Sequence, residues 1–131
     1  MDEGNTSVVV ESFAEGHFIK SFKKKHKAHW DSTFSAIIAQ LERIDNLLRT
    51  DKAEHICDAG EAKIIKTKFR ISGTTESAKT SGNRCIVAWY VERRQVSVLL
   101  VYGKTDIPGR NETSQWKNIV REAYPEFRRD L

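Results

Sequence analysis

Apolar and polar residues alternate with two different periods along the chain, and the change of period separates helical from extended segments. Over residues 30–49, apolar side chains recur at steps of three and four, which predicts an amphipathic helix. Asp31 and Ser32 provide a polar start for this helix. A shorter helix with an apolar side and a lysine-rich side is predicted over residues 15–26.

Period-two alternation dominates the second half of the chain and predicts strands. In residues 64–71, one face carries Ile65, Thr67, Phe69 and Ile71, and the other carries Lys66, Lys68 and Arg70. Two further strands are expected at residues 84–91 and 95–104, with a tight connection between them. A first strand is expected at residues 7–13.

The segments between these elements are predicted from their composition. Residues 50–62 have the character of a polar connection, and residues 72–83 are rich in Gly, Ser and Thr, which indicates a long mobile loop. Pro108-Gly109 interrupts the chain before a closing helix over residues 112–127. Residues 1–6 are polar and are expected to form a disordered tail.

These elements follow the order β-α-α-β-β-β-α and predict an α+β fold. An antiparallel sheet would pack on the long helix, and a C-terminal helix would close the chain. One sheet face would be covered by the long helix, and the other would stay partly open. The length of 131 residues suits one domain, which we place at residues 7–131.

Composition excludes several classes of protein. No apolar run reaches the roughly 20 residues that a membrane-spanning helix needs, and the N-terminus lacks the pattern of a secretory signal. We therefore expect a cytoplasmic protein with no membrane partner. Cys57 and Cys85 lack metal-type spacing, and Cys85 begins an apolar run, so we expect a buried thiol there and leave a disulfide open.

Positive charge is segregated along the chain. The formal net charge is +4, but residues 63–104 hold nine Lys and Arg residues against two acidic ones. A second basic block consists of Lys20, Lys23, Lys24, Lys25 and Lys27. Such segregation favours a polyanionic partner, although a set of solvated lysines produces the same pattern.

Strand connectivity predicts that four basic residues meet at one end of the sheet. A tight turn in the last hairpin places Arg84 opposite Gly103 or Lys104. The preceding antiparallel pair places Arg70 close to Arg84, and Lys79 lies in the loop at the same end. Arg70, Lys79, Arg84 and Lys104 are therefore the candidate catalytic residues.

Such a cluster suits RNA cleavage by the RNA's own 2′-hydroxyl, because guanidinium and ammonium groups stabilise the charge of the phosphorane. Lys66 and Lys68, with Tyr102 as a stacking aromatic, are the candidate RNA-binding residues. No metal or cofactor is implied, since the four histidines lack ligand spacing. In the alternative, the basic side chains point into solvent or pair with Asp106 or Glu112.

Three motifs carry a resemblance to a known family. They are Lys68-Phe69-Arg70, Ala78-Lys79-Thr80-Ser81-Gly82-Asn83-Arg84 and Val101-Tyr102-Gly103-Lys104-Thr105-Asp106. They resemble a strand arginine, a G-K-S-G-G-x-R loop and a φ-Y-x-K-x-[DE] hairpin end of the RelE/HigB group, in the RelE/ParE superfamily of type II toxin–antitoxin toxins. Ala78 and Ser81 depart from two small positions of the loop pattern.

The resemblance implies a RelE-like fold and a metal-free endoribonuclease toxin. Such a toxin cleaves mRNA, commonly on the ribosome, and inhibits translation. A cognate antitoxin, commonly with a helix-turn-helix, neutralises it and provides its only link to operator DNA. The resemblance assigns the same four basic residues as the catalytic set. The competing interpretation is a non-enzymatic nucleic-acid-binding or protein-interaction module with a degenerate toxin fold, for which positive charge would spread along a groove.

Overall fold

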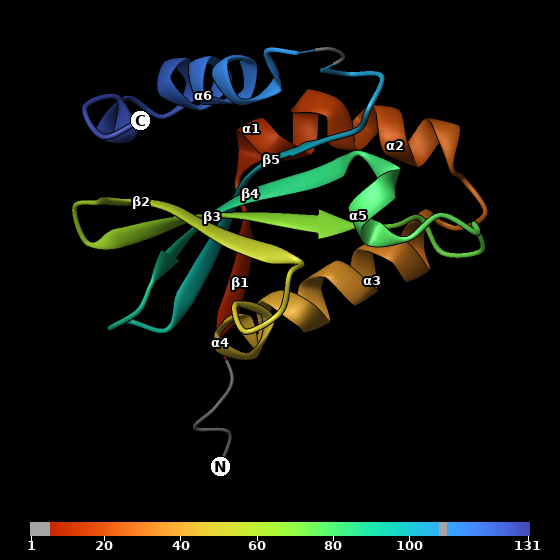
Figure 1. Cartoon of the computed structure of the whole chain (residues 1–131), viewed down its shortest axis with the longest axis horizontal. Helices are drawn as coiled ribbons and strands as arrows, with labels where there is room; N and C mark the ends of the chain where they lie inside the picture. Colours follow the sequence, from red (N-terminus) through yellow and green to blue (C-terminus); the bar gives the residue numbers. More distant parts are fainter. Residues whose placement is uncertain (1–5, 108–109) are drawn as a thin grey trace.

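One five-stranded sheet, in the order β1-β5-β4-β3-β2, forms the centre of the computed structural model, which describes residues 6–107 and 110–131 (Figure 1). The strands are β1 (Ser7–Val10), β2 (Ala53–Ala59), β3 (Ala62–Phe69), β4 (Asn83–Tyr90) and β5 (Gln95–Tyr102). β1 is parallel to β5, and the other neighbours are antiparallel. The predicted tail, apart from Thr6, and the predicted break at Pro108-Gly109 lie outside the described residues.

The helices are shorter than the apolar pattern predicts. They are α1 (Ser12–Ala14), η1 (Glu15–Ile19), α2 (Lys20–Lys25), α3 (Trp30–Leu41), α4 (Ile44–Leu47), α5 (Ala78–Ser81), α6 (Glu112–Ala123) and η2 (Pro125–Phe127). The predicted helix over 15–26 is interrupted because His17 and Phe18 have non-helical backbone angles, with a φ of 71° at Phe18. The predicted long helix is divided at Arg43, which has a φ of −120° and a ψ of 47°.

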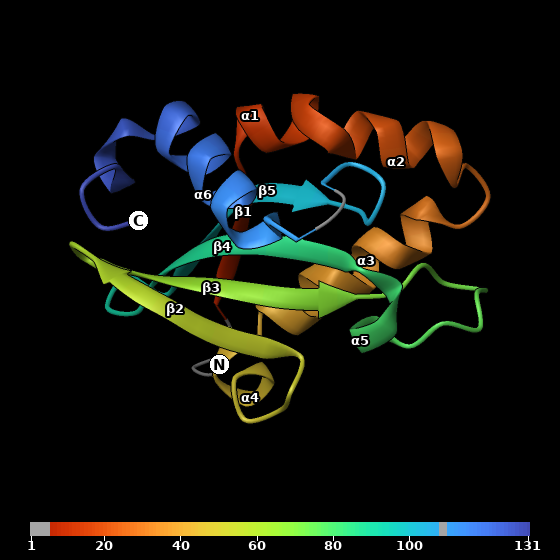
Figure 2. The same cartoon turned by 45° about the horizontal axis from the view of Figure 1, so that its top comes forward.

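Helices α3 and α6 lie on opposite sides of the sheet (Figure 2). Each helix packs on its own cluster of buried apolar residues. The first cluster includes Trp30, Ile37 and Leu41 of α3 with Ile65, Phe69 and Val87 of the sheet. The second includes Trp116 and Val120 of α6 with Ile64, Ile86 and Leu100 of the sheet. The sheet face opposite α3 was expected to stay partly open. Instead, α6 covers the apolar residues of this face. No helix in the described part of the chain is long and apolar enough to cross a membrane.

The polar connection predicted over residues 50–62 is wrong, because this segment contains strand β2. Among the described strands β2 has a single neighbour, β3, and its residues Glu54, His55 and Asp58 are exposed. An edge strand of this kind lacks the continuous apolar alternation that reveals a buried strand. Gly60, with a φ of 61°, forms the turn into β3 and supplies the backbone conformation that L side chains resist.

The last hairpin turns earlier in the chain than predicted, and a bulge then shifts its register by one residue. Between Ile86 and Val87 the pairing with β5 shifts by one residue, with Leu99 as the additional residue of β5. The last pair before the turn is Tyr90 with Gln95, so without the bulge Arg84 would lie opposite Val101. The bulge moves Arg84 opposite Tyr102, which is still one or two residues short of the predicted Gly103 or Lys104. Lys104 therefore lies two residues beyond the partner of Arg84, whereas the simple hairpin geometry predicts that it lies opposite Arg84 or next to Arg84's partner.

Candidate functional site

Four of the predicted residues stand side by side on the sheet face that carries α6. Lys68 of β3, Arg84 of β4 and Tyr102 of β5 occupy paired positions across three neighbouring strands. Lys66 lies two residues before Lys68 and therefore faces the same side of the sheet. Strand alternation thus places these four residues on one side of the sheet, which we call the basic face (Lys66, Lys68, Arg84 and Tyr102). The Lys68 ammonium group donates to the Asp51 carbonyl at 3.1 Å, and Lys68 also lines a hollow beside α3.

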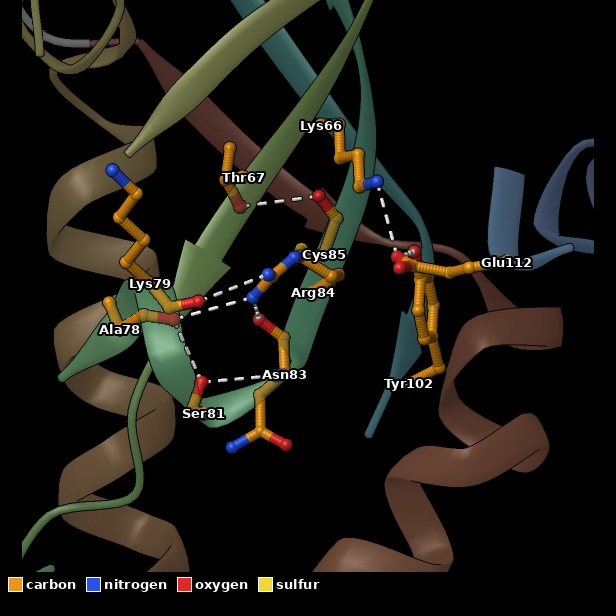
Figure 3. Close-up of polar contacts among 10 residues, drawn as sticks. All are labelled: Lys66, Thr67, Ala78, Lys79, Ser81, Asn83, Arg84, Cys85, Tyr102 and Glu112. Carbon is orange, nitrogen blue, oxygen red and sulfur yellow. Dashed lines mark hydrogen bonds and ion pairs between the residues drawn. The ribbon is translucent and has the colours of Figure 1, made fainter. Parts of the chain in front are cut away.

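The carboxylate of Glu112, the first residue of α6, is bound on the basic face (Figure 3). The Lys66 Nζ atom lies 3.1 Å from Glu112 Oε2, and the Tyr102 hydroxyl donates to the same oxygen at 2.5 Å. The side chain of Lys66 is only 15% exposed, whereas that of Glu112 is 33% exposed. A single anionic oxygen therefore receives two donors from the sheet, and the carboxylate that carries it is in contact with solvent.

The surroundings of Glu112 favour its ionised form. Partial burial raises the pKa of this carboxyl, but the hydrogen bonds from Tyr102 and Lys66 and the positive charges of Lys66 and Arg84 outweigh it, so the pKa lies below its ordinary value. Burial, followed by the hydrogen bond and charge of Glu112, raises the pKa of Tyr102. At neutral pH the basic face therefore holds a carboxylate anion and a neutral phenol.

Tyr102 does not present its ring to solvent. The residue is 1% exposed and belongs to the apolar cluster beneath α6. A base has no access to either face of the ring, which corrects the expectation that Tyr102 stacks on RNA. What Tyr102 contributes to the site is its hydroxyl, which donates a hydrogen bond to the Glu112 carboxylate.

The guanidinium of Arg84 is bound to the backbone at the start of β4. It donates to the carbonyl oxygens of Asn83 at 2.9 Å, Lys79 at 3.2 Å and Ala78 at 3.3 Å (Figure 3). Two of these carbonyls belong to α5, so Arg84 holds this helical turn against the sheet. The charge of Arg84 acts on Glu112 from this position.

The segment predicted as a long mobile loop contains α5 and is anchored. Ser77 accepts a hydrogen bond from the Thr80 backbone amide at the start of α5, and Gly82 ends it with a φ of 77°. The buried Ser81 hydroxyl lies 2.6 Å from the Phe69 carbonyl oxygen and receives the Asn83 amide at 3.0 Å. These polar contacts replace the apolar burial that the segment lacks.

Lys79 lies on α5 rather than in an irregular loop. Its side chain is exposed, and its ammonium group points away from Arg84 and Glu112 (Figure 3). Only the backbone carbonyl of Lys79 takes part in the arrangement around Arg84. The spacing between Lys79 and Arg84 thus allows the Arg84 guanidinium to hydrogen-bond to the backbone of α5, while the Lys79 ammonium group stays in solvent.

Arg70 and Lys104 line two different hollows that border α5. Arg70 lines one of about 500 Å³ beside α3, and its guanidinium donates to the Thr74 carbonyl at 3.2 Å. Lys104 lines the other, of about 260 Å³, together with His26 of the segment after α2. The structure therefore brings Lys66, Lys68, Arg84 and Tyr102 onto one face, but it does not place all four predicted catalytic side chains in one hollow.

His26 and Glu112 enter the site without having been selected from the sequence. Burial, with the nearby charges of Lys25 and His29, lowers the pKa of His26, so its imidazole is neutral at neutral pH. Glu112 appears in the sequence only as one possible partner of the basic residues, and it does pair with Lys66. The described residues contain no group of three His, Cys, Asp or Glu side chains placed to hold a metal ion.

No family model, curated protein or solved structure matches the chain. The functional argument is therefore based on the basic face, on α5 and on the motifs of the sequence.

Proposed function

We propose that the chain is a metal-independent endoribonuclease of the RelE/HigB toxin type, which cleaves mRNA on the ribosome and is neutralised by a cognate antitoxin. One observation carries this proposal: Lys66 and Tyr102, with the charge of Arg84 nearby, already bind an anionic oxygen on a sheet face. A phosphate oxygen of RNA has the charge and the hydrogen-bonding capacity of that carboxylate oxygen. The motifs that resemble the toxin family supply most of the same residues.

Cleavage would proceed through the RNA's own 2′-hydroxyl. Its oxygen attacks the adjacent phosphorus, the bond from phosphorus to the 5′-oxygen breaks, and the proton lost by the 2′-hydroxyl is balanced by one gained by the leaving oxygen. The products are a 2′,3′-cyclic phosphate and a 5′-hydroxyl. Positioned cations stabilise the additional negative charge of the phosphorane, and Arg70 and Lys104 border the same end of the sheet.

A second candidate function is RNA or protein binding without cleavage. It is favoured by the separation of Arg70 and Lys104 into two hollows and by the three backbone carbonyls that occupy the Arg84 guanidinium. Charge spread over a surface suits attraction of a polyanion, which does not require convergence on one phosphorus atom.

Induced expression in a bacterial host, with mapping of mRNA 5′ ends, distinguishes the two functions. We expect growth arrest and new internal 5′ ends with the natural chain. The control variant Lys20→Ala, which removes an exposed charge on α2, should give the same result. Arg70→Ala and Lys104→Ala should lose both, because one positioned donor contributes about 10²–10³ in rate. RNA that co-purifies with the chain without new ends would favour the binding module.

A further inference from the structure

The contact between Glu112 and the basic face determines how a phosphate could bind there. Lys66 Nζ and the Tyr102 hydroxyl converge on Glu112 Oε2, and neither donor has another hydrogen-bond or ion-pair partner among the described residues. Two donors that meet at one oxygen define a position for an anion, and that position is filled by the chain itself.

We infer that Lys66 and Tyr102 form a phosphate subsite for RNA, and that Glu112 occupies this subsite in the free chain and must be displaced before RNA binds. The inference depends on the proposed RNA-directed function and identifies a binding site and an internal competitor within it. Glu112 is suited to this role because its side chain is partly exposed and can rotate into solvent, while Lys66 and Tyr102 stay fixed by the sheet.

A hollow next to the subsite offers space for the neighbouring nucleotides of a bound RNA. A hollow of about 260 Å³ between β2 and α6 is lined by Lys66 together with His55, Thr113, Trp116 and Lys117. Trp116 is fully buried, and its Nε1 has no hydrogen-bond partner among the described residues. Because this nitrogen is buried, a ligand cannot reach it. A ligand that approaches Lys66 from this side would meet a second cation, Lys117, and the carboxylate of Glu54, which lines the same hollow.

RNA can bind only to those molecules in which the Glu112 carboxylate has left the subsite. The apparent affinity for RNA is therefore reduced by the fraction of molecules in which the subsite is open. Glu112→Gln removes the charge that attracts Lys66 but keeps the length of the side chain. A hydrogen bond to a charged group has a strength that corresponds to about tenfold in affinity. We therefore expect Glu112→Gln, and more strongly Glu112→Ala, to bind RNA at least about fivefold more tightly than the natural chain.

The test uses fluorescence anisotropy of a labelled, fully 2′-O-methylated RNA dodecamer at fixed ionic strength. This probe cannot be cleaved, so the result is independent of whether the chain is a ribonuclease. Glu122→Gln is the matched control, since Glu122 is an exposed carboxylate on the same helix and its loss changes the net charge equally. The Lys66→Met/Glu112→Gln double variant shows whether the gain depends on Lys66.

The inference is supported if Glu112→Gln exceeds Glu122→Gln by at least about fivefold and if the excess disappears in the Lys66→Met background. Equal affinities for the two glutamine variants, an excess that survives Lys66→Met, or no binding of the probe by any variant would overturn it. Competition with inorganic phosphate forms a separate arm: a gain for free phosphate without one for RNA also overturns the RNA subsite.

If the Glu112 variants do not fold, an NMR titration of the natural chain with RNA tests the inference instead. We expect the side-chain carboxyl ¹³C resonance of Glu112 to move as the RNA probe saturates the protein, because the carboxylate leaves Lys66 and Tyr102. A resonance that does not move at saturation would contradict displacement. Cleavage assays do not enter either measurement, so a chain that binds as expected but never cuts RNA would reject only the proposed function.

Discussion

The guanidinium of Arg84 is hydrogen-bonded to the backbone carbonyl of Lys79, with 3.2 Å between Nη2 and the oxygen. The two residues form the conspicuous Lys-to-Arg spacing of the sequence, yet their charged groups do not face one another (Figure 3). Arg84 positions α5, and α5 in turn separates the hollows that contain Arg70 and Lys104.

Removing the guanidinium should release α5 from the sheet. We expect Arg84→Met to speed amide hydrogen exchange over residues 78–82 by about tenfold, because at least about 1.4 kcal/mol of hydrogen bonding to a charged donor is lost. Arg70→Met is the control. Within residues 6–107 and 110–131, Arg70 donates to the Thr74 carbonyl and to no group of α5, so this variant should leave exchange in α5 unchanged. Equal exchange in the two variants would show that Arg84 does not hold this turn.

The pair of Tyr102 and Glu112 should make stability depend on acidic pH. The pKa of Glu112 in the folded chain lies below its ordinary value of 4.5, so its contribution is present above that value and is lost as the pH falls through the folded pKa. Tyr102→Phe removes one of the hydrogen bonds that lower this pKa. We expect the Glu112 pKa to rise in an NMR titration, and the variant to lose about 1–2 kcal/mol of unfolding free energy at pH 7 but less at pH 3.

Tyr124→Phe is the matched control for this effect. The Tyr124 hydroxyl donates to the Leu99 carbonyl at 2.7 Å, a neutral acceptor. Its loss should lower stability by about 1 kcal/mol at both pH values and leave the Glu112 pKa unchanged. A Tyr102→Phe variant with the same acid profile as Tyr124→Phe would contradict the assigned coupling.

The buried thiol of Cys85 should make stability fall at alkaline pH. Burial raises its pKa from 9.0 to about 12, so the unfolded thiol ionises where the folded one stays neutral. Its contribution is complete below pH 9 and is lost between pH 9 and 12, at about 1.4 kcal/mol per pH unit. The test measures the free energy of unfolding of the natural chain and of Cys85→Ala by urea at pH 8 and at pH 10.5. The difference between the two proteins should be smaller at pH 10.5 than at pH 8 by about 2 kcal/mol.

Reactivity with a thiol reagent checks the same assignment. Both cysteines are free, but Cys57 is partly exposed whereas Cys85 is fully buried. We expect one rapid modification in the native chain, at Cys57, and a second only on unfolding. Rapid native modification of the Cys57→Ala variant would place Cys85 within reach of solvent and remove the basis of the alkaline prediction.

Local alternation predicted the part of the site that lies within strands. The pattern of residues 64–71 correctly separated the buried Ile65, Phe69 and Ile71 from the basic residues of β3. The predicted proximity of Arg70 to Arg84 was close to the observed pairing, in which Lys68, two residues before Arg70, lies opposite Arg84. The buried thiol was predicted from a different stretch, the apolar run that begins at Cys85.

Features that depend on packing between distant elements were not available from the sequence. β2 was missed because an edge strand exposes Glu54 and Asp58. The place of the turn, between Tyr90 and Gln95, and the bulge at Leu99 together put Arg84 opposite Tyr102. The anchoring of α5 arises from Ser81, whose hydroxyl meets a carbonyl twelve residues earlier. The ion pair of Lys66 with Glu112 requires the docking of α6, which strand periodicity does not describe.

The chemical nature of the cut ends tests the central claim most directly. Purified chain would be added to ribosomes programmed with a defined mRNA, the cut site mapped, and the experiment repeated with a single 2′-deoxy substitution at the nucleotide 5′ to the cut. We predict 5′-hydroxyl and 2′,3′-cyclic phosphate ends on the unmodified mRNA, and no cut at the substituted nucleotide, because the 2′-oxygen is the nucleophile. An intact mRNA, 5′-phosphate ends, or a cut that persists at the deoxy nucleotide would contradict a ribonuclease that acts through the 2′-hydroxyl.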